Sequence, residues 1–300
     1  MGLWKGWIVN RKRWKIMETK KVSLLNNVME NHFFISQVKH SAYFDMKEAH
    51  VHPFYEIYYL LSGKRRIFVN HTIYVVNKGD IMAIEKGALH RTTYLSDKSH
   101  ERIAINFTDE FIKPLYEEFG KEVVLKCFQN PHMTIPASRR EYVDYLMQQM
   151  QYEYKISDIF SKRLLKNHLY ELLIFLIRCQ EFQYHTIEEL DAVDEVIQDV
   201  AKYICQNFNT QITLEDAAKQ ANMSSAYFSR KFKRTTGFGF KEYLSNIRLK
   251  EAATLLLETN ASITDIALRC GYNDSNYFGD VFKKVKGISP HQYRKNKGVI

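Results

Sequence analysis

Residues 217–243 read AAKQANMSSAYFSRKFKRTTGFGFKEY, and residues 267–293 read ALRCGYNDSNYFGDVFKKVKGISPHQY. The two segments align without a gap at an offset of fifty residues. A repeat of this size indicates one supersecondary unit that occurs twice in the chain. The positions identical in both copies are Ala217/Ala267, Ser225/Ser275, Tyr227/Tyr277, Phe228/Phe278, Phe232/Phe282, Lys233/Lys283, Gly237/Gly287 and Tyr243/Tyr293.

Each copy predicts two helices joined by a sharp turn. In the first copy, the helix over Leu214–Gln220 follows Thr213, an N-cap residue, and Asp216 is placed to complete a capping box. Asn222 stands at the turn, where a residue that tolerates a positive φ is needed. The pattern is therefore typical of a helix-turn-helix unit.

The second helix of this copy is predicted over Ser225–Thr236, between Ser224 as its N-cap and Gly237 as its C-terminal stop. Its inner face is predicted to hold Tyr227, Phe228 and Phe232. Its outer face is predicted to show Ala226, Ser229, Arg230, Lys233 and Arg234.

The second copy repeats these features. Ile263–Arg269 precedes a turn at Gly271, and Asp274 caps a predicted helix over Ser275–Lys286. Between the copies, Lys241–Glu258 predicts one amphipathic connecting helix. A stiff connector would hold the two second helices about 34 Å apart, the spacing of adjacent major grooves on one face of DNA.

The charge distribution favours the same partner. The chain of 300 residues has a formal net charge of +9, and residues 224–300 contain 14 Lys and Arg against 6 Asp and Glu. A local basic excess favours a polyanion such as nucleic acid.

These segments closely resemble the AraC/XylS family of transcription regulators. The resemblance covers about Val193–Lys297. It is carried by the run Ile212–Ser224, the string Tyr227–Lys233, the pair Gly271–Tyr272 and the stretch Tyr277–Arg294. It implies a seven-helix domain whose two helix-turn-helix units bind adjacent major grooves of promoter DNA. By motif position, the implied base contacts are Ala226, Ser229, Arg230, Ser275, Asn276, Gly279 and Asp280, and the phosphate contacts are Lys233, Lys283 and Lys284.

The two units are not expected to contribute equally. The guanidinium of Arg230 can bond guanine O6 and N7 together, so it is the strongest base-reading candidate. Gly279 and Asp280 stand where a base-reading helix often carries Arg, Lys or Gln. Since phosphate repels a carboxylate, we expect the second unit to contribute less affinity.

The sequence pattern in the first half of the chain predicts a β-sandwich or a β-barrel. Short runs rich in aromatic and β-branched residues alternate with turn residues over about 33–136, which is typical of such folds. The predicted strands are Tyr55–Leu61, Arg66–Asn70, Thr72–Val76, Asp80–Ile84 and Arg102–Phe107.

A helical pair follows over about 139–180. Its apolar stripe is Phe160, Leu164, Leu165, Leu169, Leu172, Leu173 and Leu176. Two interpretations stay open at this point: the pair covers the open face of the barrel, or it forms a dimer seam, and one surface could do both.

The front half also resembles the cupin motifs. The spacing His-x-His-x3-Glu-x6-Gly begins at His50, and a second motif ends at His90, although Glu85 and Tyr94 depart from the usual pattern. Residues of one parity line one face of a strand. The predicted ligand-binding residues are His50, His52, Glu56, Tyr58 and His90.

Two ligand classes suit this set. Hydroxyl, carboxylate and imidazole groups beside aromatic rings suit a polar, carbohydrate-like effector. Three imidazoles and one carboxylate, from His50, His52, Glu56 and His90, also suit a divalent transition metal. No cofactor is predicted, and the metal is kept as the alternative.

Composition bounds the remaining choices. Hydrophobic residues make up 45% and charged residues 26%, as in a folded protein. No apolar run is long enough to cross a membrane, and the residues before Lys21 do not make a convincing signal peptide. The scattered cysteines, expected to be free thiols in the cytoplasm, are Cys127, Cys179, Cys205 and Cys270.

The sequence thus predicts an α+β protein: a cupin-like β-barrel with a helical pair, then an all-α domain. We assign an N-terminal arm to residues 1–26, a ligand-sensing barrel to 27–136, a dimerising helical pair to 137–185 and a DNA-binding domain to 191–300. The expected function is a transcription regulator, not an enzyme. It would be a homodimer and an activator that works with RNA polymerase and responds to a small molecule. The alternatives are a metal-dependent cupin enzyme with a DNA-binding domain and a regulator controlled by a protein partner.

Overall fold

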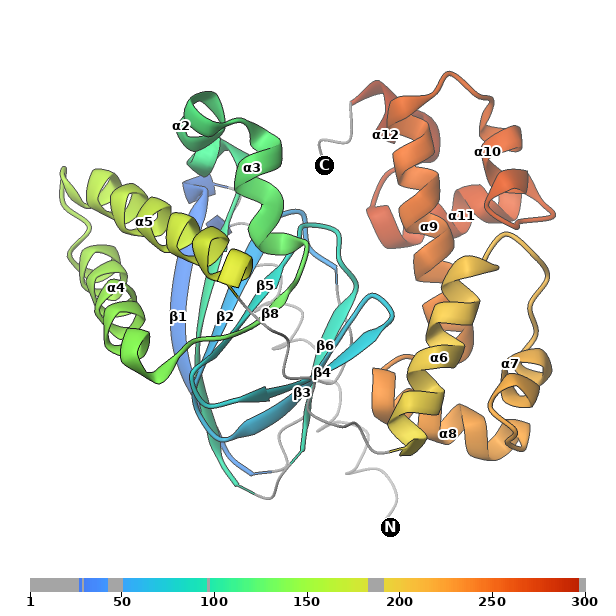
Figure 1. Ribbon diagram of the computed structural model, residues 1–300. Coiled ribbons are helices and arrows are strands. Elements are labelled where there is room, and N and C mark those ends of the chain that lie inside the picture. Colours follow the sequence, from blue (N-terminus) through green and yellow to red (C-terminus); the bar gives the residue numbers. More distant parts are fainter. Residues whose placement is uncertain (1–26, 29, 43–50, 96–97, 183–191, 297–300) are drawn as a thin grey trace, which may run out of the picture.

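The computed structural model describes residues 27–28, 30–42, 51–95, 98–182 and 192–296 (Figure 1). The predicted arm over residues 1–26 and His50 of the predicted ligand set lie outside these ranges.

Eight strands form two antiparallel sheets. The five-stranded sheet has the order β1-β7-β2-β5-β8, and the three-stranded sheet has the order β4-β3-β6. Within the described ranges no ladder joins the two sheets, so the predicted β-barrel does not close, and the strands form the two-sheet arrangement that their spacing also allowed. The strands are β1 (Phe33–His40), β2 (Tyr55–Ser62), β3 (Lys64–Val69), β4 (Thr72–Asn77), β5 (Asp80–Ile84), β6 (His90–Tyr94), β7 (His100–Phe107) and β8 (His132–Thr134).

Strand β2 is buried on both faces. Tyr55, Ile57 and Tyr59 join the core on the outer side of the five-stranded sheet. Tyr58 and Leu60 join the core between the sheets, with side chains from β3, β4 and β5. Because successive side chains point to opposite faces, one strand contributes to two cores, and Glu56 lies on the inter-sheet face.

Helices cover the outer side of the five-stranded sheet, as Figure 1 shows. The helices α4 (Ala137–Ile156) and α5 (Ser161–Phe182) confirm the predicted pair, and their buried side chains share a core with β1, β2 and β7. The covering role is thereby confirmed. The predicted stripe is wrong at Phe160 and Leu164, which are 64% and 37% exposed.

A short helical insertion was not predicted. It comprises α2 (Asp109–Phe119), α3 (Lys121–Leu125) and the 3-10 turn η1 (Lys126–Phe128). Phe111, Ile112 and Leu115 of α2 are buried against the same core. Their spacing is helical, but Pro114 inside the segment argues against a helix from sequence alone.

The C-terminal helices closely match the predicted ranges. They are α6 (Ala192–Gln206), α7 (Leu214–Gln220), α8 (Ser225–Thr236), α9 (Phe240–Glu258), α10 (Ile263–Arg269), α11 (Ser275–Lys286) and α12 (Pro290–Lys295). In Figure 1, α9 runs between the unit of α6, α7 and α8 and the unit of α10, α11 and α12. The resemblance implied seven helices here, and seven are described.

Local signals set these helix boundaries. Thr213 and Asp216 form the predicted capping box, and Asp274 accepts hydrogen bonds from the backbone N–H groups of Asn276 and Tyr277. Asn222 has φ 51°, the left-handed conformation that the turn requires.

Two other expectations concern side chains. Tyr227 is 46% exposed, so its predicted place on the inner face of α8 is wrong. All four cysteines are free thiols, as predicted. Among the described residues, no helix is both long and apolar enough to span a bilayer.

Candidate DNA interface and polar site between the sheets

The predicted base-reading face of α8 is open to solvent. Phe228 and Phe232 anchor the helix at 0% exposure, with ring centroids 5.2 Å apart. On the opposite side, Ala226 and Arg230 are exposed and Ser229 is half-buried. Lys233 is also exposed, so the predicted base and phosphate contacts of the first unit lie where DNA can reach them.

Helix α11 has the same construction. Phe278 and Phe282 are its fully buried anchors. Of the remaining predicted contacts, Asn276, Asp280, Lys283 and Lys284 are exposed, and Ser275 and Gly279 are half-buried. The predicted contacts on this face include Asp280 and no arginine. We therefore still expect the second unit to contribute less to DNA affinity than the first.

Side chains that sequence reasoning missed tie the two units together. Arg248 on α9 donates from Nε to Phe208 O (2.8 Å) and from Nη2 to Thr210 O (2.7 Å). Gln211 Nε2 donates to the carbonyl oxygen of Gly271 (3.1 Å), at the turn of the second unit. Such crossing bonds hold α8 and α11 in a fixed relation, as the expected binding in two adjacent grooves would require.

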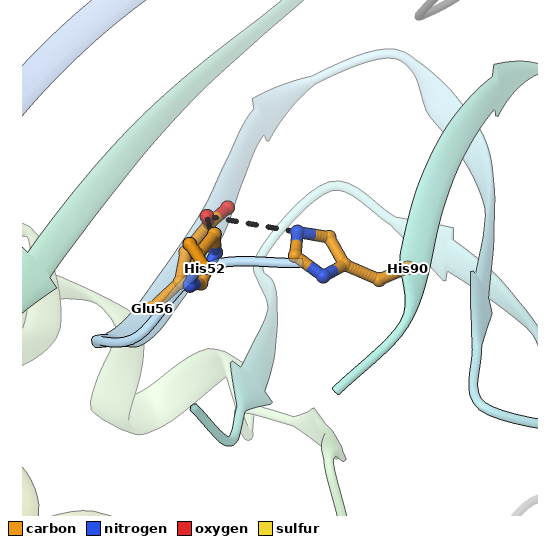
Figure 2. Close-up of side chains that lie close together, drawn as sticks. All are labelled: His52, Glu56 and His90. Atoms are coloured by element: carbon orange, nitrogen blue, oxygen red, sulfur yellow. Dashed lines mark hydrogen bonds and ion pairs between the residues drawn. The ribbon is translucent and has the colours of Figure 1, made fainter. Parts of the chain in front are cut away.

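The polar site lies between the sheets, where Glu56 on β2 and His90 on β6 point toward each other (Figure 2). Glu56 on β2 is 15% exposed, and its Oε2 lies 3.1 Å from His52 Nε2 and 3.9 Å from His90 Nε2. His52 and His90 are 7% and 2% exposed. Asn106 on β7 donates from Nδ2 to the same carboxylate oxygen (3.2 Å).

Backbone carbonyls orient both imidazoles. His52 Nδ1 donates to Phe54 O (2.7 Å), and His90 Nδ1 donates to Ala88 O (2.9 Å). Because a carbonyl only accepts, each Nδ1 carries a proton and each Nε2 faces Glu56. This outer-shell arrangement is typical of histidines that bind metals.

The three residues fit a divalent transition metal. Their ligand atoms all lie within 4.8 Å of one another, and two imidazoles with one carboxylate are a common ligand set. A proton shared between an imidazole Nε2 and the Glu56 carboxylate would also satisfy this geometry. The arrangement therefore supports either a metal ion or a proton at this position.

Charge and burial define the protonation states. Burial raises the pKa of Glu56, but the hydrogen bond from His52 and the charge of His90 outweigh it and hold the pKa well below its usual range. Burial, followed by the charge of His52, lowers the pKa of His90 to about 4. Near neutral pH the site therefore holds an ionised carboxylate beside a neutral His90.

Tyr58 extends the site along β2. It is 3% exposed, and its hydroxyl has no hydrogen-bond partner among the described residues. The guanidinium of Arg102 lies 5.8 Å from the centre of its ring. Burial raises the pKa of Tyr58 to about 12, so the hydroxyl stays protonated and can donate.

Comparison with known proteins finds a match for each half of the chain. A helix-turn-helix domain model matches residues 217–296, and an ExsA N-terminal regulatory domain model matches residues 56–187. The HTH-type transcriptional activator RhaR of Mannheimia succiniciproducens is 26% identical over 275 residues, covering 87% of this chain and 97% of its own length. The chain belongs to the AraC/XylS family. It is a DNA-binding transcription regulator, and the relatives named here are transcription regulators, not enzymes.

Two further similarities are to a relative that matches only part of the chain and to a solved structure of low sequence identity. The lactose operon transcription activator of Staphylococcus xylosus is 35% identical over 131 residues, which is 44% of this AraC/XylS regulator and 46% of the relative. A solved structure of an apo ToxT variant from Vibrio cholerae covers 88% of this chain and 97% of its own, with 14% identity and a TM-score of 0.39.

Sequence reasoning found part of this regulator's polar site. It named His52, Glu56, Tyr58 and His90, and the structure brings the first, second and fourth together. It missed Asn106 and Arg102, although their even spacing on one strand places them on the face that Glu56 shares. The partner strand can be identified only once the sheet order is known.

Proposed function

We propose that this regulator activates transcription when a small, polar, sugar-like molecule binds between its two sheets. The observation that carries the proposal is the buried Tyr58 hydroxyl, which has no partner among the described residues and lies on the strand face of Glu56. Buried polar groups are nearly always hydrogen-bonded, so a hydroxylated ligand would complete this site. The name of the lactose operon relative supports a carbohydrate.

The ligand would act by shifting a conformational equilibrium. It stabilises whichever arrangement of the two domains binds it better, by the difference between its two affinities. In the favoured arrangement, α8 and α11 enter adjacent major grooves of a promoter, and the bound protein recruits RNA polymerase.

Selection of duplexes from a random pool by the full-length protein tests the DNA part. We expect enriched sequences with two conserved elements about one helical turn apart. We also expect affinity to fall steeply as salt rises, because phosphate contacts release counterions. Equal binding of selected and random duplexes would contradict the proposed function.

A metal is the second candidate for the site. The orientation of His52 and His90 by backbone carbonyls favours it, because both Nε2 atoms face the Glu56 carboxylate. With the metal bound, these three residues would hold it, and the cation would offer its remaining positions to oxygen atoms of an effector.

Thermal unfolding of the full-length protein separates the two candidates. A true ligand at about 100 times its Kd should stabilise the fold by about 2.7 kcal/mol. In a panel of mono- and disaccharides, we expect Tyr58→Phe to weaken the response. With Zn²⁺ or Co²⁺, we expect His90→Ala to abolish it, while Tyr58→Phe leaves it unchanged.

The matched control for this experiment is His132→Ala. His132 also pairs with a carboxylate, Asp80 (3.0 Å), but lies outside the site. Failure of every saccharide to stabilise the protein would contradict the carbohydrate assignment. A metal response that survives in His90→Ala would contradict the metal candidate.

The homodimer also stays a proposal. Large apolar side chains remain exposed where α4 ends and α5 begins: Tyr152 (59%), Ile156 (46%), Ile159 (88%), Phe160 (64%) and Leu164 (37%). Pairing of this surface with a second copy would bury them. Sedimentation of Phe160→Glu as a monomer, against a dimer for the unaltered chain, would support this surface.

A further inference from the structure

The C-terminal end of the first reading helix is held by the sensor domain. Gly237 ends α8 with φ 90°, and its carbonyl oxygen accepts a hydrogen bond from Arg91 Nη1 on β6 (2.5 Å). A Cβ at Gly237 would lie 1.8 Å from Arg91 Cδ. The glycine therefore serves the helix cap and also the close approach of the sensor strand.

A second contact centres on Asp194 of α6, which is 2% exposed. This carboxylate forms an ion pair with Arg66 of β3. Thr235 of α8 donates to Asp194 Oδ1 (3.0 Å), and Lys231 Nζ of α8 lies 3.8 Å from the same oxygen. One buried carboxylate thus joins a sensor strand to α8. Removing one partner of a buried ion pair destabilises the fold, because the other charge is left buried and unpaired.

Apolar packing unites the same elements. Phe68 of β3 lies in one hydrophobic core with Phe228 and Phe232 of α8. Its ring centroid is 5.8 Å from that of Tyr243. The Tyr243 hydroxyl also donates to the backbone oxygen of Asn70 (2.8 Å). The outer face of the three-stranded sheet is therefore part of the core of the first unit.

The strands that make these contacts also line the space between the two sheets. On β6, His90 points towards Glu56, and the next residue, Arg91, binds the end of α8. On β3, Ile67 lies in the inter-sheet core, and its neighbours Arg66 and Phe68 contact the DNA-binding domain. A single peptide unit separates the two environments.

The second unit provides an internal comparison. At the offset of fifty residues, Asp194 corresponds to Leu244, Lys231 to Val281 and Thr235 to Val285. Val285 is 51% exposed. The core of the second unit contains side chains from α9 to α12 only, within the described residues. Among the described residues, these sensor contacts therefore hold α8, and none of them reaches α11.

We infer that Arg91 and the Arg66–Asp194 ion pair are positioning residues for the first reading helix, and that they transmit the state of the polar site to DNA through α8. The inference rests on the proposed function. Linkage between two sites is reciprocal, so DNA bound to α8 must affect β3 and β6. This reciprocity makes the inference testable without knowing the effector.

Amide hydrogen exchange of the full-length protein, with and without a selected duplex, tests it. We expect DNA to slow exchange in β3 and β6. In Arg91→Ala, DNA should bind about 2- to 30-fold more weakly, and the slowing in the two strands should disappear. Arg91→Lys, which keeps a donor, should restore part of both effects.

The matched control is Arg140→Ala. The Nε of Arg140 also donates to a backbone oxygen, that of Ile135 (3.1 Å), but on the helical side of the sensor. Thermal unfolding of each variant separates misfolding from uncoupling, and Arg91→Lys keeps the test valid if Arg91→Ala does not fold.

The outcomes are distinct. DNA binding that leaves β3 and β6 unchanged would overturn the inference and leave the proposed function standing, as would equal effects of Arg91→Ala and Arg140→Ala. No specific DNA binding by the unaltered chain would overturn both.

Discussion

Replacing Arg230 with alanine should weaken specific DNA binding by about 1–3 kcal/mol. The side chain is exposed near the middle of α8, opposite the buried rings of Phe228 and Phe232. A guanidinium there can form two hydrogen bonds with guanine, and alanine can form none. Fluorescence anisotropy with a selected duplex measures the loss, and duplexes changed at single base pairs should show relaxed specificity at one position.

Two other variants distinguish base reading from phosphate contact. Lys233→Ala should weaken binding to all duplexes alike and reduce the salt slope by about 1. Asp280→Ala should cost little or strengthen binding, because it removes a carboxylate from a face that approaches phosphates. A large loss for Asp280→Ala together with none for Arg230→Ala would contradict the assignment of roles.

Replacing Phe278 with alanine should lower the free energy of unfolding of the second unit by about 3–5 kcal/mol. The ring is fully buried, with the rings of Tyr272 and Phe282 at centroid distances of 5.2 and 5.6 Å. The core of this unit is small and draws on α9 to α12 only among the described residues, so little surrounding structure can relax into the cavity. Hydrogen exchange should become faster in α10, α11 and α12.

The repeat offers a matched variant and a neighbouring control. Phe228→Ala removes the equivalent ring from a core that includes sensor side chains, so faster exchange should extend to β3. Tyr277→Ala changes a neighbouring aromatic residue that is 63% exposed, and its effect should stay within about 0.5 kcal/mol. Equal destabilisation by Phe278→Ala and Tyr277→Ala would show that the second unit is not held by this core.

The helical half could be predicted closely because its determinants are local. Thr213 with Asp216, Asn222 and Asp274 each act within a few residues, and the structure confirms them. Tyr227 was placed wrongly because a helix face is set by what packs against it, and the sequence does not show the neighbours.

The β-domain could be predicted only in part, because strand partners are distant in sequence. Local patterns located β2 and β5, but the register that pairs Glu56 with Asn106 joins residues fifty positions apart. The separation of the strands into two sheets, and hence the open edges, follows from such pairings. Equally, no local pattern links Arg66 to Asp194 or Arg91 to Gly237.

The shared core of Phe68 with α8 sets a limit on modularity. Regulators of this architecture invite chimeras in which one sensor is fused to the tail of another. In such a chimera, the DNA-binding domain would expose the apolar surface that packs against Phe68 of its own sensor in this protein. A functional graft would therefore have to carry the outer face of the three-stranded sheet along with the DNA-binding domain, so a cut made in engineering such a chimera would have to fall inside the sensor.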